Sequence, residues 1–254
     1  MFDYQNYPNV EELMISTPWS NVAIVATESG NNLINLGHEK LRWPSEAKML
    51  VTQKGKKLII EIQNPSNAKN LQVNFDIKAP KNTKLELNLN NSDDIKINGI
   101  AGNIAVNTGN LRTVNFENDG AITLNSGNIE KVTATKIDSL NMNVGNVSHA
   151  VIEDLQQDLH YNGGNGKLDI KFTDKLTASH HIDLNGGTID FNLWAPKDTA
   201  VNNTLEAPPF TLNITSDFAK PGTSATNNTT TKANGNAIEI SGSIGIGSVT
   251  LKAL

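Results

Sequence analysis

Three stretches in the middle of the chain share one pattern, and this pattern decides the fold. Residues 104–111 read IAVNTGNL, residues 122–129 read ITLNSGNI and residues 140–147 read LNMNVGNV. Their asparagines at 107, 125 and 143 recur twice with a period of 18. Apolar and polar residues alternate before each asparagine, as in a β-strand, and a glycine two residues later favours a turn. The sequence therefore predicts β-coils of about 18 residues.

One such unit cannot bury its apolar face alone, so we expect successive units to stack and their inward residues to form columns. The pattern continues with looser spacing at Asn162 and Asn185, offsets of 19 and 23. We expect two short strands per coil, with aligned asparagines hydrogen-bonded along the stack. The predicted fold class is all-β, a single-stranded β-solenoid or β-helix with β caps. A right-handed coil is favoured, and an ordinary β-sandwich is the alternative.

A second repeat brackets the first. Residues 75–83 read FDIKAPKNT and residues 191–199 read FNLWAPKDT. Each copy predicts a strand that is stopped by proline and followed by a turn. The two copies indicate either related sheet-forming blocks or matching entry and return strands.

Composition changes along the chain predict three segments of one continuous domain. Residues 1–62 are expected to form an N-terminal β cap, because a solenoid end needs cover for its core and its edge. Residues 63–200 form the repeat region, and residues 201–254 supply the last strands. Within that last segment, residues 221–236 are rich in Gly, Ser, Thr and Asn and are predicted to be a mobile loop.

Charge and composition exclude several classes of protein. The 254 residues carry a formal net charge of −5, and Arg42 and Arg112 are the only arginines, which is a poor composition for binding nucleic acid. With no cysteine, disulfides, thiolate catalysis and cysteine-ligated metal sites are excluded. No apolar run approaches the ~20 residues of a membrane-spanning helix, and the N-terminus lacks the features of a signal peptide.

Sequence motifs of known enzymes are weak. Ser66 and Lys69 fit the Ser-x-x-Lys string of β-lactamases, but the chain has no Lys-Thr-Gly partner for it. Gly242, Gly245 and Gly247 resemble a nucleotide-binding glycine pattern, yet they open no helix and fit small residues in a crowded strand better.

The serious enzymatic alternative is a β-helix lyase or hydrolase that acts on polysaccharides with carboxylates, often around calcium. The candidate carboxylates are Asp93 and Asp94, the Glu153–Asp154 pair, and Asp158. Acidic pairs of this kind also occur as solvated turn residues, and the scarcity of arginine and aromatic residues favours that interpretation.

Histidines and tryptophans supply two further hypotheses. The offset of 23 places His160 beside Asp183 and Asp158 beside His181, an arrangement that could bind a divalent metal. Cross-strand hydrogen bonding is the favoured interpretation. Three tryptophans, Trp19, Trp43 and Trp194, could form a ligand platform. The favoured interpretation is that they fill the ends of the core.

The chain resembles the bacterial family of adhesin-like proteins called DUF4097 and the related head-domain adhesins of β-solenoid form. The resemblance covers residues 10–254 and rests on three features. These are glycine turns at 102, 109, 120 and 127, the Ala-Pro elements at 79–80 and 195–196, and the strands that lead to Gly55-x-x-Leu58. It implies an all-β repeat domain associated with the cell envelope, with no established catalytic residues to transfer.

Together these observations predict a non-enzymatic β-solenoid of the cell envelope, an adhesin or surface scaffold, with no catalytic residues, metal or cofactor and with unknown binding residues. The expected partner is a cell-surface protein or glycan, and end strands could pair between copies. The predicted location is the cell envelope or the exterior, with the cytoplasm left open. The alternatives are the polysaccharide-active enzyme and an envelope-stress regulatory module.

Overall fold

The computed structural model describes residues 1–27, 33–63, 71–208, 211–218 and 236–254. All regular secondary structure in these residues is β-strand, which confirms the all-β prediction. Backbone contacts divide the chain into two units, Met1–Gly127 (unit 1) and Asn128–Leu254 (unit 2). The segment boundaries at 62 and 200 stay predictions. Except for Asn236, the predicted loop 221–236 lies outside the described residues.

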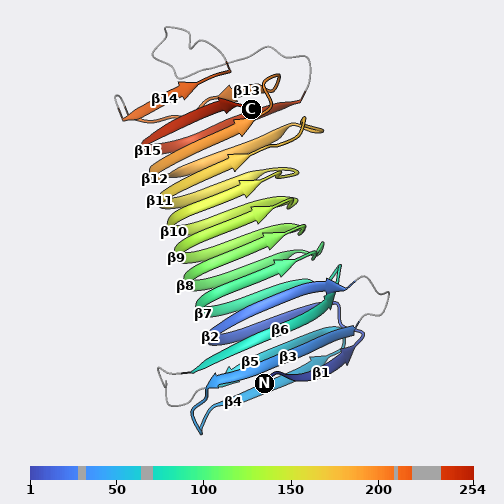
Figure 1. The fold of residues 1–254 in the computed structure, drawn as a ribbon. Coiled ribbons are helices and arrows are strands. Elements are labelled where there is room, and N and C mark those ends of the chain that lie inside the picture. Colours follow the sequence, from blue (N-terminus) through green and yellow to red (C-terminus); the bar gives the residue numbers. More distant parts are fainter. Residues whose placement is uncertain (28–32, 64–70, 209–210, 219–235) are drawn as a thin grey trace. The chain divides into compact units, whose positions relative to one another are not determined.

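One strand, β8 (Ile104–Glu117), shows how the repeat makes a coil. Val106 is buried before an exposed corner at Gly109, and Phe116 is buried after it. Both arms therefore turn their apolar side chains inward, and burial of these side chains drives the coil to close. Figure 1 shows the ribbon of the coils doubling back on itself. The two strands predicted per coil are thus the two arms of one bent strand.

Unit 1 contains parallel coils and antiparallel strands. Its strands follow the order β1 (Asp3–Pro8), β3 (Leu33–Arg42), β6 (Gln72–Pro80), β2 (Glu12–Thr27), β7 (Lys84–Asn98), β8 and the first half of β9 (Ala121–Thr135). The strands β6, β2, β7 and β8 pair in parallel. β1 and β3 pair antiparallel, and β3 pairs antiparallel with β6. β5 (Lys57–Gln63) pairs in parallel with β2 and antiparallel with β4 (Lys48–Lys54).

The first 62 residues therefore hold two kinds of strand. β1, β3 and β4 are antiparallel strands. β2, by contrast, is a full parallel coil, because Leu13 and Ile15 are buried on its first arm and Val22 and Ile24 on its second.

Unit 2 is a parallel stack. Its strands follow the order second half of β9, β10 (Ser139–Glu153), β11 (Leu159–Lys171), β12 (His180–Ala195), β15 (Ala237–Ala253) and β13 (Ala200–Asn203), with β14 (Leu212–Ser216) also on β15. Every pairing from β10 onward is parallel. Asn143 pairs with Asn162, and Asn162 pairs with Asn185. These registers confirm the predicted offsets of 19 and 23.

The second repeat marks the two places where consecutive strands of the chain are not neighbours in the sheet, because another strand lies between them. In unit 1 the chain runs from β6 through the turn at 81–83 to β7, and β2 lies between those two strands (Figure 1). In unit 2 it runs from β12 through the turn at 196–199 to β13, and β15 lies between them. Both turns close alike: the Thr83 N–H donates to the Pro80 carbonyl at 3.0 Å and the Thr199 N–H to the Pro196 carbonyl at 2.9 Å.

Candidate functional site

A ladder of asparagine amides crosses unit 1. Asn125 Nδ2 donates to Asn107 Oδ1 at 2.7 Å, and Asn107 Nδ2 donates to Asn88 Oδ1 at 2.8 Å. Asn88 Nδ2 in turn donates to Glu86 Oε1 at 3.0 Å. The predicted bonding between aligned asparagines is confirmed here. Asn125 and Asn107 both donate toward β7, so the first of these bonds polarises the next.

A groove of about 630 Å³ runs along this ladder, over residues of β5, β2, β7, β8 and β9 within unit 1. Its volume falls within the range of sites for small ligands, roughly 300–1,000 Å³. Pro18, Ile62 and Leu89 contribute apolar surface, and the other lining residues are Asn, Ser, Thr and Gly. No lining side chain carries a charge. At the corner, a Cβ on Gly109 would lie 2.6 Å from the Asn90 carbonyl oxygen, so the coils approach closely there.

Sequence reasoning named no binding residues, and this groove is what it missed. The signal that could have found it is Asn88, which pairs in register with Asn107. Asn88 lies outside the period of 18, because its offset from Asn107 is 19 and no glycine follows it at the corner.

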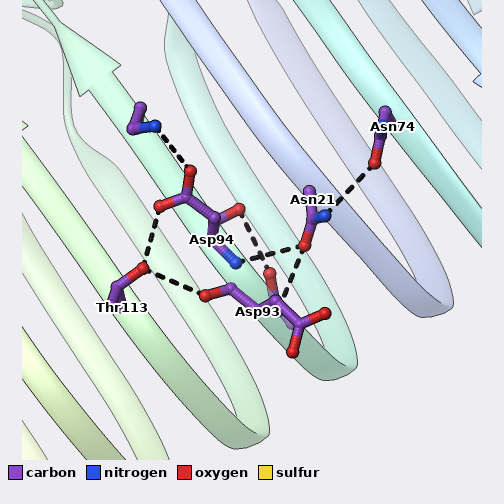
Figure 2. A network of polar contacts seen from close by, with 7 residues as sticks. Asn21, Asn74, Asp93, Asp94 and Thr113 are labelled. Atoms are coloured by element: carbon purple, nitrogen blue, oxygen red, sulfur yellow. Dashed lines mark hydrogen bonds and ion pairs between the residues drawn. The ribbon is translucent and has the colours of Figure 1, made fainter.

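Asp93 and Asp94, the first carboxylate candidates, form part of a structural network (Figure 2). Asn21 Oδ1 accepts hydrogen bonds from the backbone N–H groups of both residues, each at 3.1 Å. Asn21 Nδ2 donates to Asn74 Oδ1 at 3.2 Å. The register of β2 on β7 shifts at this point, and Asn21 satisfies the two backbone donors that the irregularity leaves unpaired in the ladder.

The two side chains of this pair do not act together. The Asp94 carboxylate accepts a hydrogen bond from Thr113 Oγ1 at 2.9 Å and pairs with Lys96 Nζ at 2.7 Å. The Asp93 carboxylate points away from it in Figure 2 and lies 3.8 Å from Arg112 Nε. Paired acid–base chemistry needs two carboxyl groups that face one substrate, and these face different directions.

The other carboxylate candidates lie in unit 2 and also hold turns. Asp154 Oδ1 accepts the backbone N–H of Thr173 at 2.8 Å. Asp158 Oδ1 accepts the backbone N–H of His181 at 3.0 Å. Glu153 lies at the end of β10 and pairs with Lys171 of β11 in register. These contacts support the interpretation as turn residues.

The predicted histidine alignment is confirmed by the register. His160 lies opposite Asp183, with Nδ1 3.7 Å from Oδ2. The second pair differs from the metal hypothesis, because Asp158 binds the backbone N–H of His181 while the imidazole lies 3.2 Å from Ser241 Oγ. Among the described residues, no group of three or more His, Asp or Glu could hold a metal ion.

The glycine-rich motif of β15 has a packing explanation. A Cβ on Gly242 would lie 2.1 Å from the Leu184 carbonyl oxygen, and one on Gly247 would lie 1.9 Å from that of Ile189. β15 therefore fits against β12 only without side chains at these points. Ser66 and Lys69, the weak β-lactamase-like match, lie outside the described residues.

The three tryptophans are half-buried and do not fill the core. Trp43 and Trp194 lie beneath lysine ammonium groups, with the Lys40 and Lys252 nitrogens 4.4 and 5.4 Å from their ring centroids. Trp19 has a shielded indole nitrogen without a hydrogen-bond partner.

Two buried groups have perturbed acidities. Burial raises the pKa of Asp119 to about 6, although its carboxylate accepts the backbone N–H groups of Ile100 at 2.8 Å and Glu117 at 3.0 Å. Burial also raises the pKa of Tyr161 to about 12, and its hydroxyl donates to the Asn165 carbonyl at 3.1 Å. Perturbed groups often mark functional sites, but Asp119 is engaged between the turns of two successive coils and Tyr161 at the corner of its own coil.

Comparison with known proteins finds no matching family model and no matching curated protein. Three solved structures illustrate the likenesses found. A protein of Clostridium sporogenes ATCC 15579, provisionally named a cell adhesion protein, is 12% identical over 100% of both chains, with a TM-score of 0.33. A provisionally named adhesin of Bacteroides fragilis NCTC 9343 is 10% identical over 99% of this chain and 97% of its own, with a TM-score of 0.31. A provisionally named lipid-binding protein of Parabacteroides distasonis ATCC 8503 is 10% identical over 99% and 96%, with a TM-score of 0.27.

One further observation concerns the membrane. In the part of the chain that the structure describes, no helix is long and apolar enough to cross a bilayer.

Proposed function

We propose that this chain is a non-enzymatic binding or scaffold domain of the bacterial cell envelope, with an adhesin-like role. The observation that carries the proposal is the uncharged groove along the asparagine ladder of unit 1. It combines a volume suited to a ligand with a regular row of hydrogen-bonding groups, and a rigid repeat scaffold holds that row in place.

The polysaccharide-active enzyme is the less favoured alternative. The carboxylates of Asp154 and Asp158 accept backbone N–H groups and that of Asp94 pairs with Lys96, which supports structural roles for these three residues. Pairing between copies belongs to the same proposal as a surface scaffold. The strands available for it are those with one strand partner in the described part of the chain, β1 and β4 in unit 1 and β13 and β14 in unit 2.

The test is protease shaving of intact cells that express the full-length native gene, followed by mass spectrometry of the released peptides. We expect peptides of this chain to appear before any cytoplasmic marker protein. Protection until lysis would contradict the surface role and would favour an internal regulatory module, whose partner a pull-down would then identify.

A further inference from the structure

We propose that the groove of unit 1 binds an extended, uncharged polysaccharide whose successive sugar units lie over successive coils. This inference rests on the proposed binding function and names the class of ligand. Three observations support it: the lining of the groove, the spacing of its polar groups and the hydrogen-bonding capacity left on Asn107.

The lining selects for a neutral, polar ligand. Eight of its twelve lining residues carry an amide or a hydroxyl group, and no lining side chain is charged. An anionic polymer would need Lys or Arg to compensate the cost of desolvating its charges. The hydroxyl groups of a neutral sugar need amides and hydroxyls instead, and the half-buried ring of Pro18 offers aliphatic surface to the C–H face of a sugar ring.

The spacing selects for a sugar chain over a peptide. The groove crosses the strands, so its polar groups recur at the strand spacing of about 4.8 Å. A pyranose in an extended, equatorially linked chain advances by about one such spacing. A residue of extended polypeptide advances by only about 3.4 Å, so a peptide lying across the strands would fall out of step with the amides within a few coils.

The ladder leaves capacity for a ligand. A primary amide has two N–H donors and an oxygen with two lone pairs. The ladder engages one N–H of Asn107, toward Asn88, and one lone pair, from Asn125. The second N–H and the second lone pair of Asn107 match the donor and acceptor of a sugar hydroxyl.

The test is isothermal titration calorimetry on the purified full chain. The probes are unbranched β-1,4-linked oligomers of glucose and of N-acetylglucosamine, two to eight units long. Because the lining comes from five strands, we expect the affinity for one of the two series to rise about 2- to 10-fold per added sugar, and to level off near five units. Oligogalacturonate and an extended Gly-Ser peptide should bind at least 10-fold more weakly.

Three variants locate the site. Asn107→Leu removes the central amide, and Asn90→Arg fills the groove without touching the ladder. Each should lower the affinity about 10-fold or more. Asn146→Leu is the matched control, because Asn146 also accepts from one asparagine and donates to another but lies in unit 2, after its corner glycine and outside the lining of the groove: it accepts from Asn165 at 2.8 Å and donates to Asn128 at 3.0 Å. It should leave the affinity unchanged.

Three results would overturn the inference: no binding of either neutral series to the folded protein, tighter binding of oligogalacturonate or the peptide, or an equal loss of affinity with Asn146→Leu. If any of these occurs while shaving still releases the chain from intact cells, the ligand class is wrong and the surface role stands.

Discussion

Each unit has one coil that lies between two strands joined by an Ala-Pro turn, and the strands beside this inserted coil are paired differently in the two units. In unit 1 the inserted coil is β2, and its neighbours β5 and β6 are themselves paired with β4 and β3. In unit 2 the inserted coil is β15, and within the described residues β13 and β14 pair with β15 alone. The same turn motif therefore occurs in two settings. In unit 1 the strands beside the inserted coil have further strand partners, whereas in unit 2 β13 and β14 depend on β15 alone.

The turns between coils differ in a second way. In each unit a residue with positive φ is followed by a buried one. The pairs are Gly99–Ile100 and Asn118–Asp119 in unit 1, and Lys136–Ile137 and Asp154–Leu155 in unit 2. A carboxylate thus occupies a position that is aliphatic in the other three turns. The backbone, and not one type of side chain, sets this turn.

The largest expected effect tests the dependence on β15. Gly247→Ala would place a Cβ 1.9 Å from the Ile189 carbonyl oxygen, so the strand must shift. We expect a loss of about 3 kcal/mol in the free energy of unfolding of unit 2. Hydrogen exchange should accelerate in β13 and β14 together with β15, because these strands have no other described partner.

Ser248→Ala in the same strand is the control, since it removes only the exposed hydrogen bond to Asp190. The comparison is sharpened by Ile24→Ala in β2, which should destabilise unit 1 yet leave protection at the pairing of β3 with β6. Unchanged protection of β13 and β14 in Gly247→Ala would contradict the proposed dependence.

The next largest effect is a pH dependence of stability, which the turn with Asp119 should have and the three turns with an aliphatic residue at the same position should lack. Because the pKa of Asp119 rises from 3.8 to about 6 on folding, the folded state binds the proton more tightly. Its stabilising contribution is therefore complete below about pH 4 and is lost as the pH rises through about 6, a change of at most about 3 kcal/mol. Asp119→Asn should remove this decline.

Urea unfolding at pH 4 and pH 7 measures that difference. The free energy of unfolding of Asp119→Asn minus that of the parent protein should be larger at pH 7 than at pH 4. Asp138→Asn, at an exposed turn position of unit 2, is the control and should leave the pH dependence unchanged. Parallel pH profiles for the parent and Asp119→Asn would show that this carboxyl does not control the slope.

A smaller effect compares the two ladders. Asn107→Ala in unit 1 and Asn146→Ala in unit 2 each remove two amide–amide hydrogen bonds. We expect each to cost about 1 kcal/mol in thermal or urea unfolding, because exposed amides regain bonds to water. A cost that differs by more than about 1 kcal/mol between the variants would mean that the ladders are not equivalent.

The smallest effect concerns exposed ion pairs. Lys96→Ala breaks the contact of Lys96 with Asp94 in unit 1, where the lysine side chain is 62% exposed, and should cost at most about 0.5 kcal/mol. His149→Ala in unit 2 should cost more, because its partner Asp169 is only 19% exposed and loses a 2.7 Å contact. Urea unfolding of both variants in 0.1 and 1 M salt gives the comparison, and equal costs would contradict it.

The sequence by itself determined the coil. Alternating apolar residues and the period of 18 specify a bent strand with a buried inner face, and they place Asn162 against Asn185 and His160 against Asp183 in the correct register. These features are local or connect neighbouring coils, so the pattern carries them. The Ala-Pro repeat likewise predicted two related turns, but it did not predict that another strand would lie between the strands that each turn connects.

Only the tertiary structure decided which strands fill the positions beside those turns. β15 pairs with β12 across about 58 residues of sequence, and β2 lies between two strands that follow it in the chain. No periodic signal in the sequence specifies such a pairing. Its cost in chain entropy and the apolar surface that it buries are both set by the packing of all the coils of the unit. The groove shares this origin, since strands distant in sequence bring its lining together.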